Sequence, residues 1–365
     1  MGIMEKNKIL LFGVSDLFTE ETLEHILRKV SCEKKVEILS WNFGVGSSKG
    51  DAYLSVVNRI KVKGIAGSSP TEISLVVKSM PRNLGRRKML RSTDFFRNEI
   101  TFHLEIYPKF QNFLKSKDMS DFIILPRWLA AVMDGLNDFL VMEDVSIIGF
   151  SPVTRQKTLN LSQCSLILKA LARFQAIQFI NSYTGQELYD KGVEFCCRFD
   201  KPTSVINHGD TWASNFLIRN SAGENHIALM LDFQLARCAS PVLDTSFLIY
   251  TCTDKTLRDQ HYEDLLRLYH DELSKNISLL GSVLKKPWDI FVNKVQELTV
   301  HGINAAIEAV PSAMLDSSEV FDLDVSQGDE SVDIAEIFSL KPIRTKEGMH
   351  RLADVILHAV EKRYL

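Results

Sequence analysis

Two short stretches near the middle of the chain restrict its fold more than any other feature. The first, "HGDTWASN", sets Asp210 five positions before Asn215. The second, "LDFQLAR", carries Asp232 at the end of the apolar run "IALML". The apolar strings "SNFLI" and "IALML" have the pattern of two strands that pair as a β-hairpin. A hairpin returns the chain to the loop that it left, so we expect the side chains of residues 210, 215 and 232 to meet at one end of it.

These side chains are the kind that phosphoryl transfer from ATP requires. One carboxylate must orient the attacking hydroxyl, while an oxygen ligand and a second carboxylate hold magnesium. The protein-kinase template places the first two as H-R-D, four residues and N, with the second carboxylate after a short hairpin. Asp210 and Asn215 have that offset, and Asp232 lies 22 positions beyond Asp210. The spacing predicts Asp210 as the catalytic residue, and Asn215 and Asp232 as ligands of Mg²⁺.

The first third of the chain is rich in Val, Ile and aromatic residues, arranged in strings that turn-forming stretches separate. Three consecutive strands with short connections indicate an antiparallel meander. The predicted strands span residues 36–41, 52–64 and 72–80.

Most of the remaining chain has the apolar spacing of amphipathic helices. A short apolar strand at 138–145 interrupts this pattern, and one helix is expected to end at Pro108. A small sheet followed by a larger, mainly helical part predicts an α+β protein with two domains, 1–143 and 144–365. The predicted helices span residues 16–30, 93–108, 161–180, 257–273 and 345–363.

The sheet region also offers candidates for phosphate binding. Lys78 lies inside the apolar strand "SLVVKSM", and Glu99 follows on the next helix. In the kinase template a strand lysine contacts the α- and β-phosphates, and a helix glutamate orients it. Gly46 and Gly50 lie in "GVGSSKGD" between two strands, where backbone N–H groups can cover phosphates. The plainer alternatives are an edge-exposed lysine, a solvated acid and an ordinary Gly-rich hairpin.

The motifs "HGDTWASN", "LDFQLAR" and "SPVLDTSFLIY" resemble those of the ecdysteroid kinase-like family. This family comprises arthropod relatives of choline kinase and the aminoglycoside phosphotransferases. The resemblance implies a protein-kinase-like bilobal fold, with a small antiparallel-sheet N-lobe and a larger, mainly helical C-lobe. It also implies ATP and Mg²⁺ as cofactors and a small-molecule alcohol, such as an ecdysteroid, as the phosphate acceptor.

The resemblance assigns further residues. "VMEDV" matches the hinge between the lobes, whose main chain around Met142 and Glu143 would bind adenine. Asp244 either caps the helix that starts at "TSFLIY" or braces the catalytic loop. His208 is expected to brace that loop rather than to act as a general base.

The chain departs from the family pattern in three places, the first of which is Ala52 in the Gly-rich loop, where the family tends to have Asn. Relatives carry a helical insertion of several tens of residues before the HGD motif, but Tyr183 and His208 are only 25 residues apart. Gln175 stands where the family usually has His. The shortened insertion indicates either a reduced acceptor pocket or an incomplete transcript.

Several observations limit which class of molecule can be the phosphate acceptor. Asp244 lies only 12 positions after Asp232, which leaves no room for the activation segment with which protein kinases dock peptides. A small-molecule acceptor is therefore expected. Two alternatives stay open: an ATP-binding pseudokinase with a defective acceptor site, and a kinase of the choline or aminoglycoside type. The latter needs an acid-lined pocket for a cation, which the sequence does not reveal.

Composition excludes other classes of function. The net charge of −3 gives no electrostatic reason to expect a nucleic-acid partner. No apolar run approaches the roughly 18 residues of a membrane helix, and no protein partner is evident. The six cysteines form no CxxC pair, and the N-terminus lacks a signal-peptide pattern, so a cytoplasmic location is expected. The basic run 82–91 is either a solvated connection or an attraction site for ATP.

Overall fold

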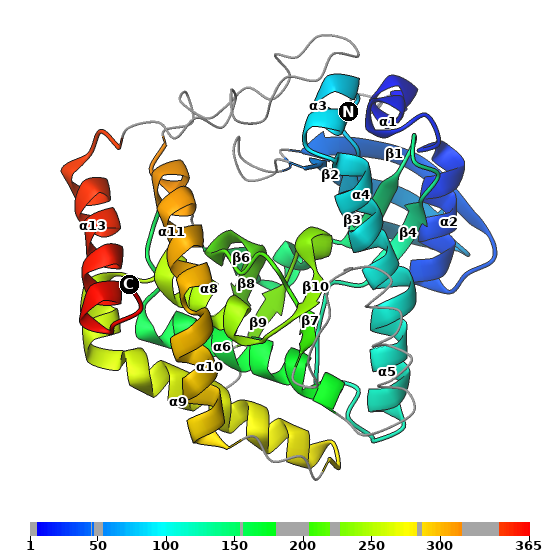
Figure 1. Cartoon of the computed structure of the whole chain (residues 1–365). Coiled ribbons are helices and arrows are strands. Elements are labelled where there is room, and N and C mark those ends of the chain that lie inside the picture. Colours follow the sequence, from blue (N-terminus) through cyan, green and yellow to red (C-terminus); the bar gives the residue numbers. More distant parts are fainter. Residues whose placement is uncertain are drawn as a thin grey trace. The chain divides into compact units, whose positions relative to one another are not determined.

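The computed structural model describes residues 6–44, 46, 54–153, 156–179, 204–219, 227–282, 287–315 and 343–365. The chain forms two compact units, whose elements Figure 1 labels. Within the described ranges, unit 1 holds residues 6–103 and 126–149, and unit 2 holds 104–125, 150–315 and 343–365. The linear domain boundary at 143/144 stays a prediction.

Unit 1 is built on a five-stranded antiparallel sheet with the strand order β1-β2-β3-β5-β4. The predicted meander is confirmed, because β1, β2 and β3 pair in sequence through short connections. The predicted strand at 138–145 is β5, in the interior of the sheet beside β3. The strands span Val36–Gly44 (β1), Val56–Ala66 (β2), Ser69–Ser79 (β3), Trp128–Val132 (β4) and Phe139–Glu143 (β5).

Helices cover the apolar face of this sheet. Leu23, Ile26 and Leu27 of α2 are buried in one core with β-strand residues such as Val62 and Val141, as the amphipathic spacing requires. Among the described residues of unit 1, the α-helices are α1 (Lys8–Val14), α2 (Glu20–Ser31), α3 (Leu84–Met89) and α4 (Ser92–Thr101). A 3₁₀ turn, η2 (Val145–Ile148), follows β5.

The helix expected to end at Pro108 continues past it, so that prediction is wrong. A π-helical turn, η1 (Phe102–Ile106), follows α4, and α5 (Tyr107–Lys115) begins at once with Pro108 in its first turn. Proline is tolerated there because the first N–H groups of a helix have no intrahelical acceptor.

Unit 2 is mainly helical, and α6 packs on α9 while α8 packs on α11 (Figure 1). The helices predicted at 161–180, 257–273 and 345–363 correspond to α6, α9 and α13. The bounds are α6 (Leu161–Ala176), α8 (Val242–Cys252), α9 (Lys255–Leu279), α10 (Trp288–Leu298), α11 (Val300–Ala313) and α13 (Lys346–Glu361).

Short strands and 3₁₀ turns in unit 2 shape the loops that carry the sequence motifs. The predicted hairpin is confirmed: β8 pairs antiparallel with β9, with Phe216 opposite Met230. A second pair joins β7 to β10. The strands are β6 (Ser151–Pro152), β7 (Val205–Asn207), β8 (Phe216–Arg219), β9 (Ile227–Met230) and β10 (Arg237–Ala239), and the turns are η3 (Ile177–Phe179), η4 (Ala213–Asn215) and η5 (Phe233–Leu235).

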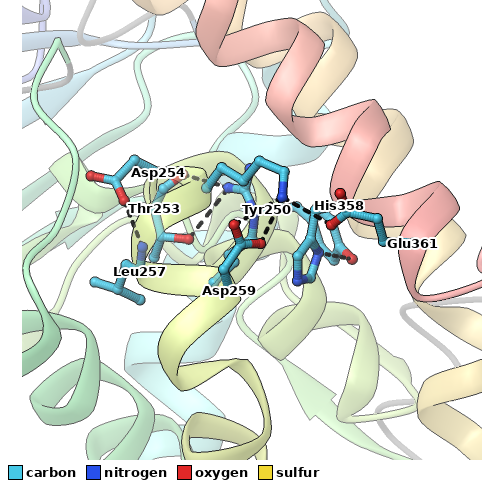
Figure 2. Close-up of polar contacts among 9 residues, drawn as sticks. Tyr250, Thr253, Asp254, Leu257, Asp259, His358 and Glu361 are labelled. Carbon is cyan, nitrogen blue, oxygen red and sulfur yellow. Dashed lines mark hydrogen bonds and ion pairs between the residues drawn. The ribbon is translucent and has the colours of Figure 1, made fainter.

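The last helix, α13, is fixed to α8 and α9 by polar contacts (Figure 2). The Tyr250 hydroxyl lies 2.9 Å from Nδ1 of His358, and the rings of both residues pack with that of Tyr262. Lys255 Nζ lies 2.9 Å from Glu361. These contacts join segments about a hundred residues apart in the sequence.

The antiparallel unit and the mainly helical unit confirm the α+β fold class. Within the described ranges, none of the helices combines the length and apolarity needed to cross a bilayer. The four described cysteines, Cys32, Cys164, Cys238 and Cys252, are free thiols.

Candidate active site

The hairpin of β8 and β9 brings Asn215 and Asp232 to the same end. Asn215 directly precedes β8, and Asp232 follows β9 by two residues. The N–H of Leu231 donates to the carbonyl oxygen of Asn215 at 2.8 Å, which ties the two chain segments together. The sequence expectation that these positions meet at one end of a hairpin is met by this geometry.

Asp210 and Asn215 are in direct contact. The side-chain amide nitrogen of Asn215 donates to Oδ2 of Asp210 at 2.9 Å and to its carbonyl oxygen at 3.0 Å. Both acceptors lack a hydrogen, so the nitrogen of the amide must face Asp210. The amide oxygen of Asn215 therefore points elsewhere and retains its lone pairs for a cation or a donor.

Asp232 completes a group of three oxygen-bearing side chains. Its backbone is left-handed, with φ 66° and ψ 71°, a region that Asp adopts more readily than most residues. Burial, and next the nearby negative charge of Asp232, raise the pKa of Asp210 to about 6. The negative charges of the two carboxylates therefore oppose each other at this end of the hairpin.

These oxygens suit a magnesium ion. Mg²⁺ prefers oxygen ligands, and it is usually held by one or two carboxylates together with waters and substrate phosphates. Asp232 and the amide oxygen of Asn215 could serve as these few protein ligands, and a cation would offset the repulsion between Asp210 and Asp232; their role as metal ligands stays a prediction. In the described part of the chain, no cluster of three or more His, Cys, Asp or Glu side chains forms an alternative metal site.

Asp244 fixes the backbone that carries Asp210. Its carboxylate is buried and accepts the backbone N–H groups of His208 at 2.8 Å and Gly209 at 3.0 Å. Burial raises the pKa of Asp244 to about 6, although these bonds act in the opposite direction. Pro241, rather than Asp244, caps the helix, so the capping interpretation is wrong and the bracing interpretation holds.

Glycine is required at position 209. Its φ is +85°, and a β-carbon there would lie 1.9 Å from the carbonyl oxygen of Leu235. Any other residue would push the loop away from the segment after Asp232. The "HGD" string therefore has a steric reason as well as a chemical one.

His208 is a bracing residue, as expected. One ring nitrogen, Nε2, lies 2.6 Å from the carbonyl oxygen of Leu231, and Nδ1 accepts the N–H of Asp210 at 3.3 Å. A carbonyl only accepts and an N–H only donates, so Nε2 carries the hydrogen and the ring is neutral. Phe216 and Phe233 pack on the ring, which leaves it no path to a substrate.

Two residues near the loop were given no role by sequence reasoning. Gln175 is buried in α6; its amide nitrogen donates to Asp244 at 2.9 Å and its oxygen accepts the hydroxyl of Tyr269. Arg237 approaches the carbonyl oxygen of Gly209 at 3.4 Å, and its charge opposes the rise in pKa at Asp244. In the sequence, only its place in the motif "LDFQLAR" indicates that Arg237 lies near the candidate site.

In unit 1, Lys78 and Glu99 form the expected pair. Lys78 Nζ lies 2.7 Å from Oε1 of Glu99, and both side chains are buried, with 8% and 1% exposed. Lys78 lies on β3 between Val57 of β2 and Leu140 of β5, so it is not an edge lysine. Glu99 lies on α4 and is not a solvated acid. Their role toward phosphates stays a prediction.

The structure describes less of the surroundings of the other residues that are predicted to bind the nucleotide. A β-carbon on Gly46 would lie 1.8 Å from the carbonyl oxygen of Val57, so only glycine fits this approach to β2. Gly50 lies outside the described residues. Met142 and Glu143 end β5, and the N–H of Glu143 donates to the carbonyl oxygen of Arg127 at 3.0 Å. The N–H of Glu143 is therefore already hydrogen-bonded within the protein. Nucleotide binding by the main chain of Met142 and Glu143 stays a prediction.

Comparisons with known proteins agree with the sequence motifs. A model of the ecdysteroid kinase-like family matches residues 49–189 and 181–282, and the two matches overlap at residues 181–189. A search among curated proteins found no match.

Solved structures give only weak overall likeness. An ethanolamine kinase of Plasmodium vivax is 13% identical, with a TM-score of 0.40, over 89% of this chain and 83% of its own. A GDP complex of a mutant aminoglycoside 2'-phosphotransferase-IIIa is 13% identical, with a TM-score of 0.42, over 93% and 99%. A microcompartment-associated aminopropanol kinase is 10% identical, with a TM-score of 0.37, over 79% and 93%.

Proposed function

Because this chain belongs to the ecdysteroid kinase-like family, we propose that it transfers phosphate from ATP, with Mg²⁺, to a hydroxyl of a small molecule. The family consists of kinase-like small-molecule phosphotransferases with a protein-kinase-like fold. The family name favours an ecdysteroid or another lipophilic alcohol as the acceptor. Asp210 would be the catalytic residue, and Asn215 and Asp232 would hold the metal.

The observation that carries this proposal is the contact between Asp210 and Asn215 beside Asp232. Asn215 restrains one oxygen of Asp210 at 2.9 Å, which leaves the other oxygen to receive a substrate hydroxyl. The same bond directs the amide oxygen of Asn215 away from Asp210. One side chain thus orients the catalytic carboxylate and contributes a metal ligand.

Asp210 would act as a general base. With a pKa of about 6 it is mostly ionised at pH 7, and it is more basic than an ordinary aspartate. The hydroxyl oxygen attacks the γ-phosphorus, its proton passes to Asp210, and ADP leaves with the electrons of the broken P–O bond. Bound Mg²⁺ would neutralise phosphate charge, while Asp232 and Asn215 fix its position.

Unit 1 would supply the nucleotide contacts. Glu99 holds Lys78 at 2.7 Å, so the ammonium is fixed before a phosphate arrives and little rearrangement is needed. Gly46 and Gly50 would allow main-chain N–H groups to approach the phosphates. Main-chain atoms near Met142 and Glu143 would contact adenine.

The segment after Asp232 supports a small acceptor. The turn η5, strand β10 and the start of α8 at Val242 occupy it fully. A peptide-docking activation segment has no place between these elements. A steroid alcohol, choline and an amino sugar remain the acceptors to compare.

The test is transfer of labelled phosphate from ATP to a panel of ecdysteroids, choline and amino sugars. We expect transfer to a lipophilic alcohol and its loss in Asp210→Asn, by a factor of about 10² or more. The melting temperature should still rise with Mg-ATP, because Asp210 is not needed to bind the nucleotide. Asp121→Asn, which changes an exposed acid, is the matched control.

The outcomes separate the alternatives. Unchanged turnover in Asp210→Asn would remove Asp210 from its role. A melting shift with Mg-ATP but no transfer to any alcohol would favour the pseudokinase. Transfer to choline or amino sugars alone would identify the third alternative.

A further inference from the structure

One face of the sheet in unit 1 packs on helices, and the other face carries Lys78. Ile60, Val77 and Val141 belong to the core that α2 covers. Successive side chains of a strand point to opposite faces of the sheet. Lys78 follows Val77 on β3 and therefore lies on the face away from this core. Arg59 precedes Ile60 on β2, so it lies on the same face as Lys78.

Arg59 belongs to a row of residues that crosses this face from β2 to β5. It is opposite Val76 of β3, and Val76 is opposite Met142 of β5. Residues directly opposite each other in paired antiparallel strands have their side chains on one face. Val76 lies two residues from Lys78, or about 7 Å along β3. The proposed function sets the phosphates at Lys78 and the base near Met142, so the row of Arg59 lies at the base end of this face.

The guanidinium of Arg59 is held toward the segment that follows β5. Its Nη1 donates to Oδ2 of Asp144 at 2.6 Å and to the hydroxyl oxygen of Ser146 at 3.0 Å. Asp144 is itself fixed, because its Oδ1 accepts the N–H of Ser146 at 3.0 Å and its own N–H donates to the carbonyl oxygen of Ser74 at 3.0 Å. Among the described residues, the guanidinium makes both hydrogen bonds through Nη1, and the Arg59 side chain is still 38% exposed. Its planar group is therefore fixed at one edge and accessible elsewhere.

The ion pair determines which part of a nucleotide Arg59 can contact. The carboxylate of Asp144 offsets the positive charge of Arg59, so the pair has little net attraction for a phosphate. A bond at one edge leaves the flat faces of a guanidinium free, and Arg stacks on aromatic rings and on nucleobases. Val57 and Val76 are half-buried on the same face and add apolar surface beside it. This combination favours a planar aromatic group as the ligand.

We propose that Arg59 stacks on the base of the bound nucleotide, and that Asp144 is the positioning residue that holds its guanidinium. The inference rests on the proposed function, because it requires a nucleotide on the face that carries Lys78. It adds to that function the side chain that recognises the base, whereas Lys78 contacts the phosphates.

The test compares the affinities of Mg-ATP, adenosine and Mg-tripolyphosphate for the full chain, measured by isothermal titration calorimetry. Arg59→Lys keeps the positive charge but removes the planar group. We expect it to weaken the binding of Mg-ATP and adenosine about tenfold and to leave the binding of Mg-tripolyphosphate unchanged. Asp144→Asn should weaken the two adenine ligands less, because Asp144 acts only through Arg59. The melting temperature of each variant without ligand shows whether it is folded.

The matched control is Lys61→Met, which removes a positive charge two positions along β2 on the same face, where Lys61 pairs with Glu72 at 3.3 Å. It should leave all three affinities unchanged. The inference alone is wrong if Arg59→Lys binds Mg-ATP as tightly as the wild type, or if it loses affinity for Mg-tripolyphosphate as much as for Mg-ATP. A wild type that binds neither Mg-ATP nor adenosine would instead overturn the proposed function, and the inference with it.

Discussion

At the scale of single residues, Asp244 shows how one buried side chain fixes the geometry of a catalytic loop. It accepts two consecutive backbone N–H groups, those of His208 and Gly209, and a third hydrogen bond from Gln175. The position of Asp210, the next residue in the chain, therefore depends on a carboxylate 34 residues away in α8. The conformation of the loop is therefore set by a side chain of another element rather than by the residues of the loop itself.

The raised pKa of Asp244 makes a prediction about stability. Its value of about 6 in the folded protein exceeds the ordinary 3.8, so the folded state binds this proton more tightly than the unfolded state does. The linked stabilisation is complete below pH 3.8 and is lost as the pH rises through 6. Relative to Asp244→Asn, the wild type should gain about 1 kcal/mol in free energy of unfolding between pH 7 and pH 5.

Urea unfolding of both proteins at the two pH values measures this change. Asp121→Asn serves as the control, because the residue is exposed. A difference between wild type and Asp244→Asn that is the same at pH 5 and pH 7 would contradict the assignment.

At the scale of elements, α13 depends on a histidine that resists protonation. Burial, followed by the charges of Arg258 and Lys362, lowers the pKa of His358 to about 4. Nδ1 lies 2.9 Å from the Tyr250 hydroxyl, which can donate to the neutral ring (Figure 2). Protonation would remove this acceptor and place a further positive charge among basic side chains.

The lowered pKa of His358 predicts that the free energy of unfolding changes with pH in the direction opposite to that expected for Asp244. The folded pKa lies below the ordinary 6.5, so the stabilisation is present above pH 6.5 and is lost as the pH falls toward 4. Relative to His358→Asn, the wild type should lose about 2 kcal/mol in free energy of unfolding between pH 7 and pH 5. Chemical denaturation at both pH values checks this, with the exposed His25→Asn as control. A gain at pH 5 would exclude the assignment.

The elements also show what the sequence can predict. The meander, the β8–β9 hairpin and the long helices were predicted because local periodicity sets them. Helix α1, of seven residues, and β4, of five, are too short for a clear period, and neither was predicted. Pro108 wrongly predicts a helix end, because a proline that stops a helix and a proline in a first helical turn look alike in sequence.

The contacts of the candidate site likewise fall into those that the sequence spacing predicts and those that only the packing of distant elements produces. Asp210 and Asn215 are five residues apart in one loop, so their contact could be predicted from spacing and a template. Gln175 and Tyr269 are 94 residues apart, and only the packing of α6 on α9 brings them together.

At the scale of the whole molecule, the proposed function assigns a role in using the nucleotide to each of the two units. Lys78 and Glu99 belong to unit 1, whereas Asp210, Asn215 and Asp232 belong to unit 2. Lys78→Met should reduce the rise in melting temperature with Mg-ATP and lower turnover on the order of 100-fold. Glu99→Gln should have a smaller effect in the same direction, because it acts only through Lys78.

The matched control for these variants is Lys61→Met, on the neighbouring strand, where the lysine is exposed and pairs with Glu72. It should leave both measurements unchanged. If Lys61→Met and Lys78→Met behaved alike, the buried ion pair would have no special part in nucleotide binding.

The most direct measurement is a crystal structure of the full chain with Mn²⁺ and a non-hydrolysable ATP analogue, using the anomalous signal of manganese to locate the ion. We expect a manganese peak about 2.2 Å from the Asp232 carboxylate and from the amide oxygen of Asn215, in contact with the terminal phosphates. Manganese bound away from these two side chains, with the nucleotide present, would contradict the proposed site.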